Sequence, residues 1–560
     1  MSSDKRATAM RATMRSHKGN VTTLLCACAA AFSGCAVGPD YQRPALPAAS
    51  SYAPAPLPES TGSAPGPVGE AQRFVIAGQV QGDWWALFQS PALNALISQA
   101  FAANPTMEAA RAALVAAQEN VEAQRGLFYP TAQANYAPSR TRTADALASP
   151  AASGATYFTL HTAQLTVGFM PDVFGGNRRQ VESLEAQAAN QKFQLEAAYV
   201  TLASSIAAAA IQEALLREQI AISGRIVDAG EQSLALTRRQ RQAGTASQLD
   251  VSLQETALAQ VQQQLPPLQK QLGQTRHLLQ ALAGSTPDGA APPPFELAAF
   301  KLPDALPLSL PSQLLEQRPD VRAAEEQLHA ASAQIGVATA NRLPQFTIDA
   351  TAGGAASTLA RVFAAPGQFF SVAGILTQSV FDGGTLQHRQ RAAEAAYAQA
   401  AAQYRSTVLA AFQNVADSLQ ALYNDADSLR ASAATAQSSA QTLALVRRQL
   451  AGGYIDRLAL LTAGQAHDQA LLAVASARAV RLGETVSLFQ ALGGGWWSRA
   501  PGATPDGPWH HRNGCVVGAL GDEQAGAGVG EAAQRHERSA ARCGQAAGGA
   551  SGESYGKECC

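Results

Sequence analysis

The chain has 560 residues, a formal net charge of −1, 15% charged residues and 6% aromatic residues. It therefore has no basic field for nucleic acid, and no run of about 18 uncharged apolar residues after the N-terminus that would predict a membrane-spanning helix. The apolar residues make up 47% of the chain and are dominated by alanine, which favours long, closely packed helices. All seven cysteines lie before residue 36 or after residue 514, so we expect no disulfide, thiolate metal site or cysteine nucleophile between them.

The N-terminal stretch, residues 1–34, has a basic region, a short apolar run and small residues before a break. This order predicts a secretory signal peptide. Residues 35–80 are rich in Pro, Ala, Ser and Gly and predict an extended tether. The aromatic pair Trp84 and Trp85 follows; a ligand-stacking site is conceivable, but a hydrophobic anchor that packs the tether onto the body is the favoured interpretation.

A helical segment occurs twice in the chain. Residues 319–344 align on residues 105–130 without a gap when the sequence is shifted by 214 positions, 319 minus 105. Both copies begin and end with proline, which suits the first turn of a helix and cannot continue one. The fixed spacing predicts an internal two-fold repeat.

Each copy of this helix leads into residues that alternate between apolar and polar. The two stretches, 131–170 and 345–381, each predict a pair of strands around a loop of small residues, near 144–156 and 354–367. Short and modest alternation of this kind is typical of membrane-barrel strands.

Each strand pair ends in a glycine turn that precedes a run almost without Gly or Pro, at 177–242 and 385–451. A run of about 66 residues predicts a helix of about 100 Å. Each long helix reverses at a matched turn into a shorter one, at 247–283 and 456–491. We expect two short helices, end to end, to lie beside each long helix.

These elements divide the rest of the chain into four segments. The first repeat spans 81–285, a Pro-rich linker spans 286–311, and the second repeat spans 312–497. Residues 498–560 are rich in Gly and Ala and show no apolar period, so they predict a disordered tail.

The sequence shows no pattern typical of a catalytic or metal site. The nine histidines are scattered, and no HExxH motif, Walker loop or nucleophile elbow is present. We therefore expect a protein that is not an enzyme and that has no cofactor and no metal.

Several short motifs together resemble one known family. They are CAVGPDYQRP, DWW, LNALISQAFAANP, DVFGGNRR, RPDVRAAEEQL, VFDGGTL and ALGGGW, spread over residues 35–497. This set is similar to the TolC-like outer-membrane efflux factors, in particular the NodT-type lipoproteins. FSGC resembles a lipobox, with Phe32 where Leu is usual, which implies acylation of Cys35. Ala36 in the next position favours the outer membrane.

The resemblance implies a membrane α/β fold. Three chains of four strands would form a twelve-stranded transmembrane β-barrel, continued by a long periplasmic α-helical barrel. Independently, four strands cannot close a membrane barrel alone, because open strand edges are not tolerated in lipid. The implied protein is a homotrimer in the outer membrane, lipid-anchored, with a periplasmic helical extension.

The implied function is a passive exit duct for small molecules in a tripartite efflux pump. Its partners would be a periplasmic adaptor protein, an inner-membrane pump, which we expect to be proton-driven, and outer-membrane lipid. Within this class, the exit duct of a type I protein secretion system is the alternative. An alternative of another class is a non-conducting coiled-coil lipoprotein that spaces the envelope.

The two turns near 244–250 and 453–458 are expected at the periplasmic end, because the strands lie at the other end of the long helices. We expect the adaptor to dock there, on turns marked by Arg239, Gly244, Arg448 and Gly453. The candidate gate residues are Leu249, Asp250, Asp456, Leu458 and Thr462.

The two aspartates of this set allow two interpretations. They could form a carboxylate ring across three chains, with bonds to Arg457 or Arg241 that hold a closed state, or they could only cap helices. The family often places an inward aspartate where this chain has Thr462, and an apolar constriction at Leu249 and Leu458 is then the alternative gate.

Overall fold

The computed structural model describes residues 36–45, 51–52, 58–142, 157–289 and 292–499. The predicted signal peptide, Cys35 and residues 500–560 of the predicted tail lie outside these residues. All described residues belong to one compact unit, Met1–Thr504.

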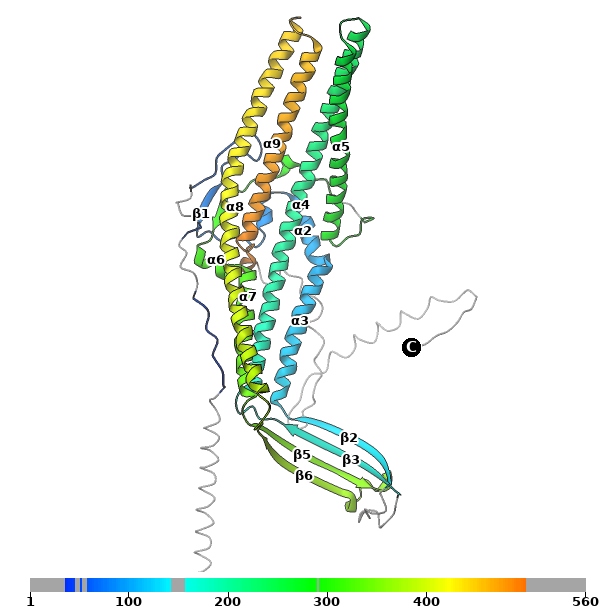
Figure 1. The fold of residues 1–560 in the computed structure, drawn as a ribbon, viewed down its shortest axis with the longest axis vertical. Helices are drawn as coiled ribbons and strands as arrows, with labels where there is room; N and C mark the ends of the chain where they lie inside the picture. Colours follow the sequence, from blue (N-terminus) through cyan, green and yellow to red (C-terminus); the bar gives the residue numbers. More distant parts are fainter. Residues whose placement is uncertain (1–35, 46–50, 53–57, 143–156, 290–291, 500–560) are drawn as a thin grey trace, which may run out of the picture. The chain divides into compact units, whose positions relative to one another are not determined.

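Two helices of 67 residues dominate this unit: α4, Gly176–Gln242, and α8, Thr385–Ala451 (Figure 1). The bounds of both helices agree to within one residue with the predicted runs, 177–242 and 385–451. Each helix begins after a left-handed glycine, Gly175 or Gly384. An aspartate just before each glycine turn caps the helix that follows. Asp172 accepts bonds from the N–H groups of Asn177 and Arg178, both at 2.9 Å. Asp382 accepts bonds from the N–H groups of Gly384, just before α8, and of Leu386 in its first turn, both at 2.8 Å.

Shorter helices lie along the two long ones, as the sequence predicts. Two of them, α3 and α5, contact α4, while α7 and α9 contact both α4 and α8. Their bounds are α3 Pro105–Arg125, α5 Gln248–Leu282, α7 Pro319–Ala340 and α9 Arg457–Ala491. The helices are therefore arranged with α3 and α5 on one side, then α4, then α7 and α9, and finally α8 (Figure 1).

A four-stranded antiparallel sheet joins the two halves of the chain (Figure 1). Its order is β2-β3-β5-β6, so the central pair, β3 and β5, comes from different halves. The outer strands β2 and β6 are exposed along their whole length. The bounds are β2 Thr131–Arg142, β3 Tyr157–Phe169, β5 Gln345–Ala356 and β6 Gln368–Thr377.

The strand register gives this sheet two different faces. Residues directly opposite each other in an antiparallel pair lie on the same face. One row across the four strands is Ala134, Leu165, Ala352 and Phe370. The neighbouring row, on the other face, is Gln133, Thr166, Thr351 and Ser371. One face is thus mainly apolar and the other mainly polar. The apolar face also carries Arg140, Thr159, His161 and Gln368, and the polar face also carries Phe158, Leu160, Phe369 and Ile375.

The core of the unit lies around the middle of the long helices. The short helix η1, Trp84–Phe88, and α2, Pro91–Ala103, pack into it. Trp84 is fully buried and stacks on Phe489 of α9, with ring centroids 5.2 Å apart. The structure therefore confirms the anchor interpretation of the tryptophan pair.

Parts of the predicted tether and linker are folded against the rest of the chain, which the sequence analysis did not predict. Strand β1, Arg73–Ile76, lies in the tether and pairs in parallel with β4, Ala305–Leu308, in the linker. The linker also contains η4, Leu297–Ala299, and leads into α6, Pro311–Gln317. The apolar side chains of these segments, among them Val68, Phe300 and Leu306, are buried. Proline and glycine content suggested extended chain, but scattered apolar residues find partners far away in the sequence.

Arg481 of α9 holds the folded tether in place. Its guanidinium is fully buried and donates hydrogen bonds to the carbonyls of Val68, Gly62 and Glu70 and to Thr61 Oγ1, at 2.5–3.5 Å. Burial lowers the pKa of Arg481. This one side chain therefore satisfies four acceptors of a segment that has little regular structure.

The predicted tail begins two residues too early. The short helix η7, Trp496–Ser498, continues the folded chain, and Arg499 pairs with Glu196 of α4 at 3.1 Å and lies over the Tyr199 ring at 4.8 Å. These contacts add Ser498 and Arg499 to the folded unit.

Among the described residues, one helix, α4, is long and apolar enough to cross a membrane by length and hydropathy alone, but 78% of its apolar window is buried inside the protein. Its composition is that of a core helix. In contrast, α5 is mostly exposed and contains Pro266 and Pro267 in its interior, where each removes one backbone donor.

Candidate functional site

The two helix reversals close in the same way. Gly244 and Gly453 both adopt left-handed backbone, with φ of 76° and 73°. In the first turn the N–H of Thr245 donates to Gln240 O at 2.9 Å; in the second the N–H of Tyr454 donates to Gln449 O at 3.0 Å. This pattern is the Schellman end of a helix, and glycine is favoured at its left-handed position. The paired glycines thus occupy equivalent turns at one end of the α4–α5 and α8–α9 hairpins (Figure 1).

Within the chain, both tip aspartates cap helices. Asp250 and Ser247 form a capping box at the start of α5, and the Asp250 carboxylate accepts bonds from the N–H and hydroxyl of Ser247 at 2.7 and 2.8 Å. These hydrogen bonds lower the pKa of Asp250. Asp456 caps α9 by accepting the N–H of Ala459 at 2.9 Å. The carboxylates are thereby engaged by backbone groups of their own turns.

Within this single chain, neither Asp250 nor Asp456 bonds to Arg241 or Arg457 among the described residues, and the bonds expected across three chains stay a prediction. Arg457 instead donates to Gln232 at 3.4 Å. The reason is local: a carboxylate at the first turn of a helix is already satisfied by free N–H groups a few ångströms away.

The other gate candidates lie near the starts of α5 and α9. Leu249 and Leu458 are each the second residue of their helix; Leu249 is exposed and Leu458 half-buried. The Thr462 hydroxyl donates to Leu458 O at 3.0 Å. The structure therefore places the five residues near the two tips, with Thr462 bonded to its own helix.

The arginines of the docking turns point to solvent. Arg239 and Arg448 lie in the last turn of α4 and of α8, where a positive charge complements the helix dipole. Both are exposed, and neither has an ion-pair partner among the described residues. They are free to contact another molecule.

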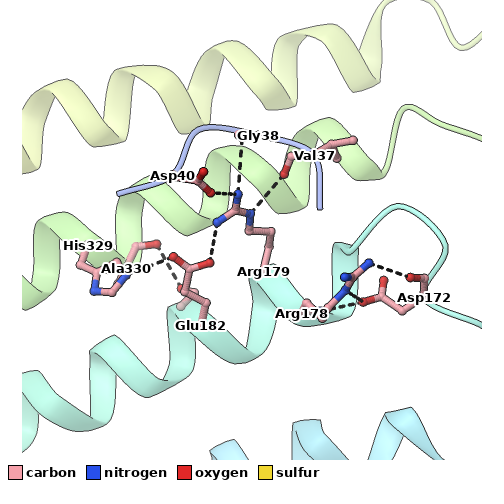
Figure 2. Close-up of polar contacts among 10 residues, drawn as sticks. Val37, Gly38, Asp40, Asp172, Arg178, Arg179, Glu182, His329 and Ala330 are labelled. Atoms are coloured by element: carbon pink, nitrogen blue, oxygen red, sulfur yellow. Dashed lines mark hydrogen bonds and ion pairs between the residues drawn. The ribbon is translucent and has the colours of Figure 1, made fainter. Parts of the chain in front are cut away.

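A second site lies at the opposite end of the helices, where strand β3 leads into α4 (Figure 2). Residues 36–43 dock there against α4 and α7. The N–H of Val37 donates to Phe174 O at 3.1 Å. Arg179 of α4, with 7% of its side chain exposed, donates to Val37 O at 3.2 Å and to Asp40 Oδ1 at 2.7 Å, and it pairs with Glu182 at 2.7 Å.

Further contacts extend this second site along α7. The Tyr41 ring stacks on His329, with centroids 4.4 Å apart. His329 Nε2 lies 3.1 Å from Glu182 Oε1 (Figure 2). Burial, followed by the charge of Glu325, raises the pKa of Tyr41. Arg43 pairs with Glu325 at 2.9 Å. We call residues 36–43 with Arg179, Glu182, Glu325, His329 and Gly336 the N-terminal dock.

The sequence analysis missed the N-terminal dock. It used GPDYQR only as a family motif within an expected tether, and the docking partners lie on two helices more than a hundred residues away. The one local signal was an acidic and an aromatic residue next to Gly38 and Pro39 in an otherwise bland segment.

The chemistry of both sites is that of packing and docking. No cluster of three or more His, Cys, Asp or Glu side chains that could hold a metal occurs in the described part of the chain.

Comparison with known proteins finds a matching family model and several similar proteins. The family model described as "outer membrane efflux protein" matches residues 96–285 and 310–494. The pyoverdine export outer membrane protein OpmQ of Pseudomonas putida is 29% identical over 451 residues, which cover 80% of this chain and 95% of OpmQ. The outer membrane protein OprJ of Pseudomonas aeruginosa is 29% identical over 491 residues, which cover 86% of this chain and 97% of OprJ.

Solved structures give the same result. The outer-membrane channel OprN matches with a TM-score of 0.71 and 25% identity over 82% of this chain and all of the OprN chain. The Campylobacter jejuni CmeC outer membrane channel has the same fold, with a TM-score of 0.71 at 17% identity over 82% of this chain and 95% of the CmeC chain.

Proposed function

Because the chain belongs to the outer membrane efflux protein family and is the outer-membrane component of an efflux system, we propose that three copies close into one continuous duct. The four-stranded sheets form a twelve-stranded transmembrane barrel, and the helices form a periplasmic α-barrel. The two halves of the chain, each with a strand pair, arose by internal duplication.

The observation that carries this proposal is the two-faced sheet with open edges. Rows of Ala, Leu, Val and Phe on one face and of Gln, Thr and Ser on the other suit lipid outside and water inside. An open edge in lipid is costly, so β6 of one copy pairs with β2 of the next. Their directions allow this, because four alternating strands leave the two edges antiparallel.

The helices support the same head-to-tail contact. Helix α8 buries one stripe, which recurs every three or four residues, and exposes the rest, including Leu409 at 64%. At the other edge, α3 and α5 are largely exposed. When α8 of one copy packs against α3 and α5 of the next, each long helix has short helices on both sides, and the ring closes.

The aromatic residues near the helix-side ends of the strands support the membrane position. Tyr129, directly before β2, is 72% exposed, and Phe381, after β6, is 91% exposed. Exposed aromatic rings at this level are typical of the girdle at a membrane–water interface.

A periplasmic adaptor protein docks on the tips around Arg239, Gly244, Arg448 and Gly453, and a proton-driven inner-membrane pump supplies the energy. The exposed arginines at equivalent turns support this position for the adaptor. The gate at rest lies at Leu249 and Leu458, with Asp250, Asp456 and Thr462 beside them. Since the aspartates already cap helices, the apolar pair is favoured as the constriction.

The transported molecules are small. Relatives are named for pyoverdine export and for toluene efflux, and a polar, wide lumen does not have to recognise its cargo. Export of polypeptides is the alternative within this class. A non-conducting spacer has no use for a sheet with one mainly polar and one mainly apolar face.

We also propose that Cys35 is acylated after removal of residues 1–34, so that the mature chain is anchored to outer-membrane lipid. The support is the lipobox-like FSGC sequence and the docking of the next residues at the strand–helix junction. Mass spectrometry of the mature N-terminus tests this directly: an unmodified peptide over residues 30–40 would refute it.

Conductance of the purified protein in planar bilayers tests the duct and the gate together. We expect a trimer by native mass spectrometry, with low resting conductance. Leu458→Ala should raise it if the apolar gate is right. Asp456→Asn keeps a good helix cap but removes the charge, whereas Asp456→Ala removes both. A rise in conductance with both variants would therefore assign the gate to the carboxylate. If no tip variant raises conductance, the gate is elsewhere, and a protein that never conducts would refute the duct.

A further inference from the structure

The charged residues of the four-stranded sheet are separated by face. Arg140 and Arg142 both lie on its mainly apolar face, because side chains alternate along β2 and the register places every second residue there. The single carboxylate of the four described strands, Asp349 of β5, lies on the mainly polar face. The mainly apolar face therefore carries positive charge and no acidic side chain within these strands.

The arginines are confined to one end of that face. Near the helices the face carries apolar side chains, such as Ala132, Val167 and Leu376. All of its other polar residues share the end away from the helices with the arginines: Thr159, His161 and Gln368. An apolar band that ends in two arginines marks a boundary between two environments.

The height of this boundary matches the thickness of a membrane. Arg140 and Arg142 lie nine and eleven residues beyond Thr131, the first residue of β2 (140 and 142 minus 131). At about 3.4 Å per residue and a strand tilt of about 40°, they lie about 23 and 29 Å above the helix end of the sheet. The apolar band of an outer-membrane barrel is about 25 Å tall, so both guanidinium groups lie at the level of lipid headgroups.

These headgroups belong to the outer leaflet. The helices of this outer-membrane channel family extend into the periplasm, so the opposite end of the strands faces the cell exterior. The outer leaflet of a Gram-negative outer membrane is built from lipopolysaccharide, whose lipid A carries phosphate groups on its sugars. Arginine suits such groups, because its planar guanidinium can donate two parallel hydrogen bonds to one phosphate.

The charges of both arginines are available to a ligand. Strand β2 is exposed along its whole length, and neither arginine has an ion-pair partner among the described residues. The Arg142 guanidinium lies over the Tyr157 ring, 5.6 Å from its centroid. This cation–π contact restrains the side chain without neutralising it. On the same face, Tyr136 Oη and His161 Nδ1 lie 2.9 Å apart, which adds two further polar groups.

We propose that this end of the mainly apolar face binds the lipid A part of lipopolysaccharide. We call Tyr136, Arg140, Arg142, Tyr157 and His161 the outer-leaflet site. The two arginines bind the phosphates, and the aromatic rings contact the sugars and the first methylenes of the acyl chains. The site thus holds a shell of phosphorylated glycolipid against each channel. This inference rests on the proposed trimeric barrel, in which this face is turned to lipid.

Native mass spectrometry of the purified full-length trimer tests the proposal, with bisphosphorylated lipid A as the probe. The double variant Arg140→Gln/Arg142→Gln removes both charges but keeps polar side chains, so the affinity should fall at least about tenfold. Both side chains are exposed, so the trimer should form normally. An unchanged affinity of the double variant would overturn the proposal.

Two other lipids separate phosphate recognition from general lipid binding. Lipid A without phosphates should bind the normal trimer at least about tenfold more weakly, and the double variant should bind it equally well. Phosphatidylglycerol, which has one phosphate and no sugar backbone, should bind at least about fivefold more weakly than bisphosphorylated lipid A. If either lipid binds the normal trimer as tightly as bisphosphorylated lipid A, the assignment to lipopolysaccharide phosphates is overturned.

The matched control is Arg361→Gln, in the loop between β5 and β6. Arg361 is exposed at the same end of the sheet but lies outside the strands, so this variant should change the affinity by less than about twofold. An equal loss in Arg361→Gln would show that net charge, and not this face, attracts the lipid. Conductance separates this inference from the proposed function: conducting trimers with unchanged affinity in the double variant refute only the outer-leaflet site, whereas a protein that never conducts refutes the duct.

Discussion

The two halves of the chain have the same layout but differ in how much each buries. Helices α4 and α8 both have 67 residues, and α5 and α9 both have 35. Yet α4 has more than twice as many buried residues as α8, while α7 and α9 are far more buried than α3 and α5. The first long helix is enclosed within its own chain, whereas the second exposes the face on which the proposed neighbouring copy packs.

The difference follows from the order of the helices. In the first half the long helix is flanked on both sides, by α3 and α5 and by α7 and α9. In the second half the short helices take the inner position, and α8 is left at the edge. Two long helices of equal length can thus differ in role: α4 lies in the core, whereas α8 exposes the face that we propose as an interface.

The equivalent positions Val200 and Leu409 allow the largest test of this contrast. They lie at the same place in the two long helices, but Val200 is 6% exposed and Leu409 is 64% exposed. Val200→Asp should abolish folding, because a buried unpaired charge costs about 4 kcal/mol or more. Leu409→Asp should leave the helices folded by circular dichroism but reduce the trimer at least about tenfold in native mass spectrometry. Normal trimers from Leu409→Asp would contradict the assignment of α8 as an interface.

Arg481 distinguishes α9 from α5, since no described side chain of α5 makes an equivalent set of hydrogen bonds to the folded tether. Arg481→Met should lower the free energy of unfolding by about 3 kcal/mol, because the buried acceptors at Val68 and Thr61 and the part-buried carbonyls of Gly62 and Glu70 lose their donor. Thermal unfolding in detergent measures this. The matched control, Arg276→Met on α5, should change stability by less than about 0.5 kcal/mol; equal effects of the two variants would refute the clasp.

Two truncations test at which residue the folded part of the second half ends. A stop codon after Arg499 should leave stability and trimer formation intact. A stop codon after Trp497 also removes the partner of Glu196, which is 17% exposed in its side chain, and should cost about 1.5–3 kcal/mol. Burial raises the pKa of Glu196, so the carboxylate depends on Arg499. If the two truncated proteins unfold at the same temperature, Arg499 does not belong to the folded unit.

The smallest effect concerns the two tips. Ser247 and its hydrogen bonds lower the pKa of Asp250 below 3.8 in the folded protein. A group with a lowered pKa contributes its stability above the ordinary pKa and loses it as the pH falls through the folded value. Protection of the first turn of α5 against hydrogen exchange should therefore be constant at neutral pH and fall only below about pH 3.8. Ser247→Ala should weaken this response; a response that persists unchanged would show that the capping box does not cause it.

These contrasts also show where sequence analysis succeeds. The long helices and strand pairs were predicted to within a few residues, because period-two alternation, helix length and glycine turns are local signals. The positions of the tip residues follow from the same signals. The competing interpretations of Asp250 needed the structure, since only coordinates show the carboxylate bonded to Ser247.

Other features have no local signal at all. The pairing of β1 with β4 and the contacts of Tyr41 and Arg43 in the N-terminal dock depend on residues hundreds of positions apart. The unequal burial of α4 and α8 was also beyond reach, because the two helices have similar alanine-rich compositions, and only the arrangement of the chain decides which one lies inside.

The pairing of β1 with β4 has a consequence for the order of folding. Arg73 must wait for Ala305, which is 232 residues later (305 minus 73), before this two-stranded sheet can form. The N-terminal dock waits even longer, for Gly336 on α7. If the chain enters the periplasm N-terminus first, these contacts cannot form until well over half of the chain has crossed the inner membrane. Non-local contacts of this kind slow folding, so the unfinished chain exposes apolar helix faces for an extended period and depends on holding chaperones.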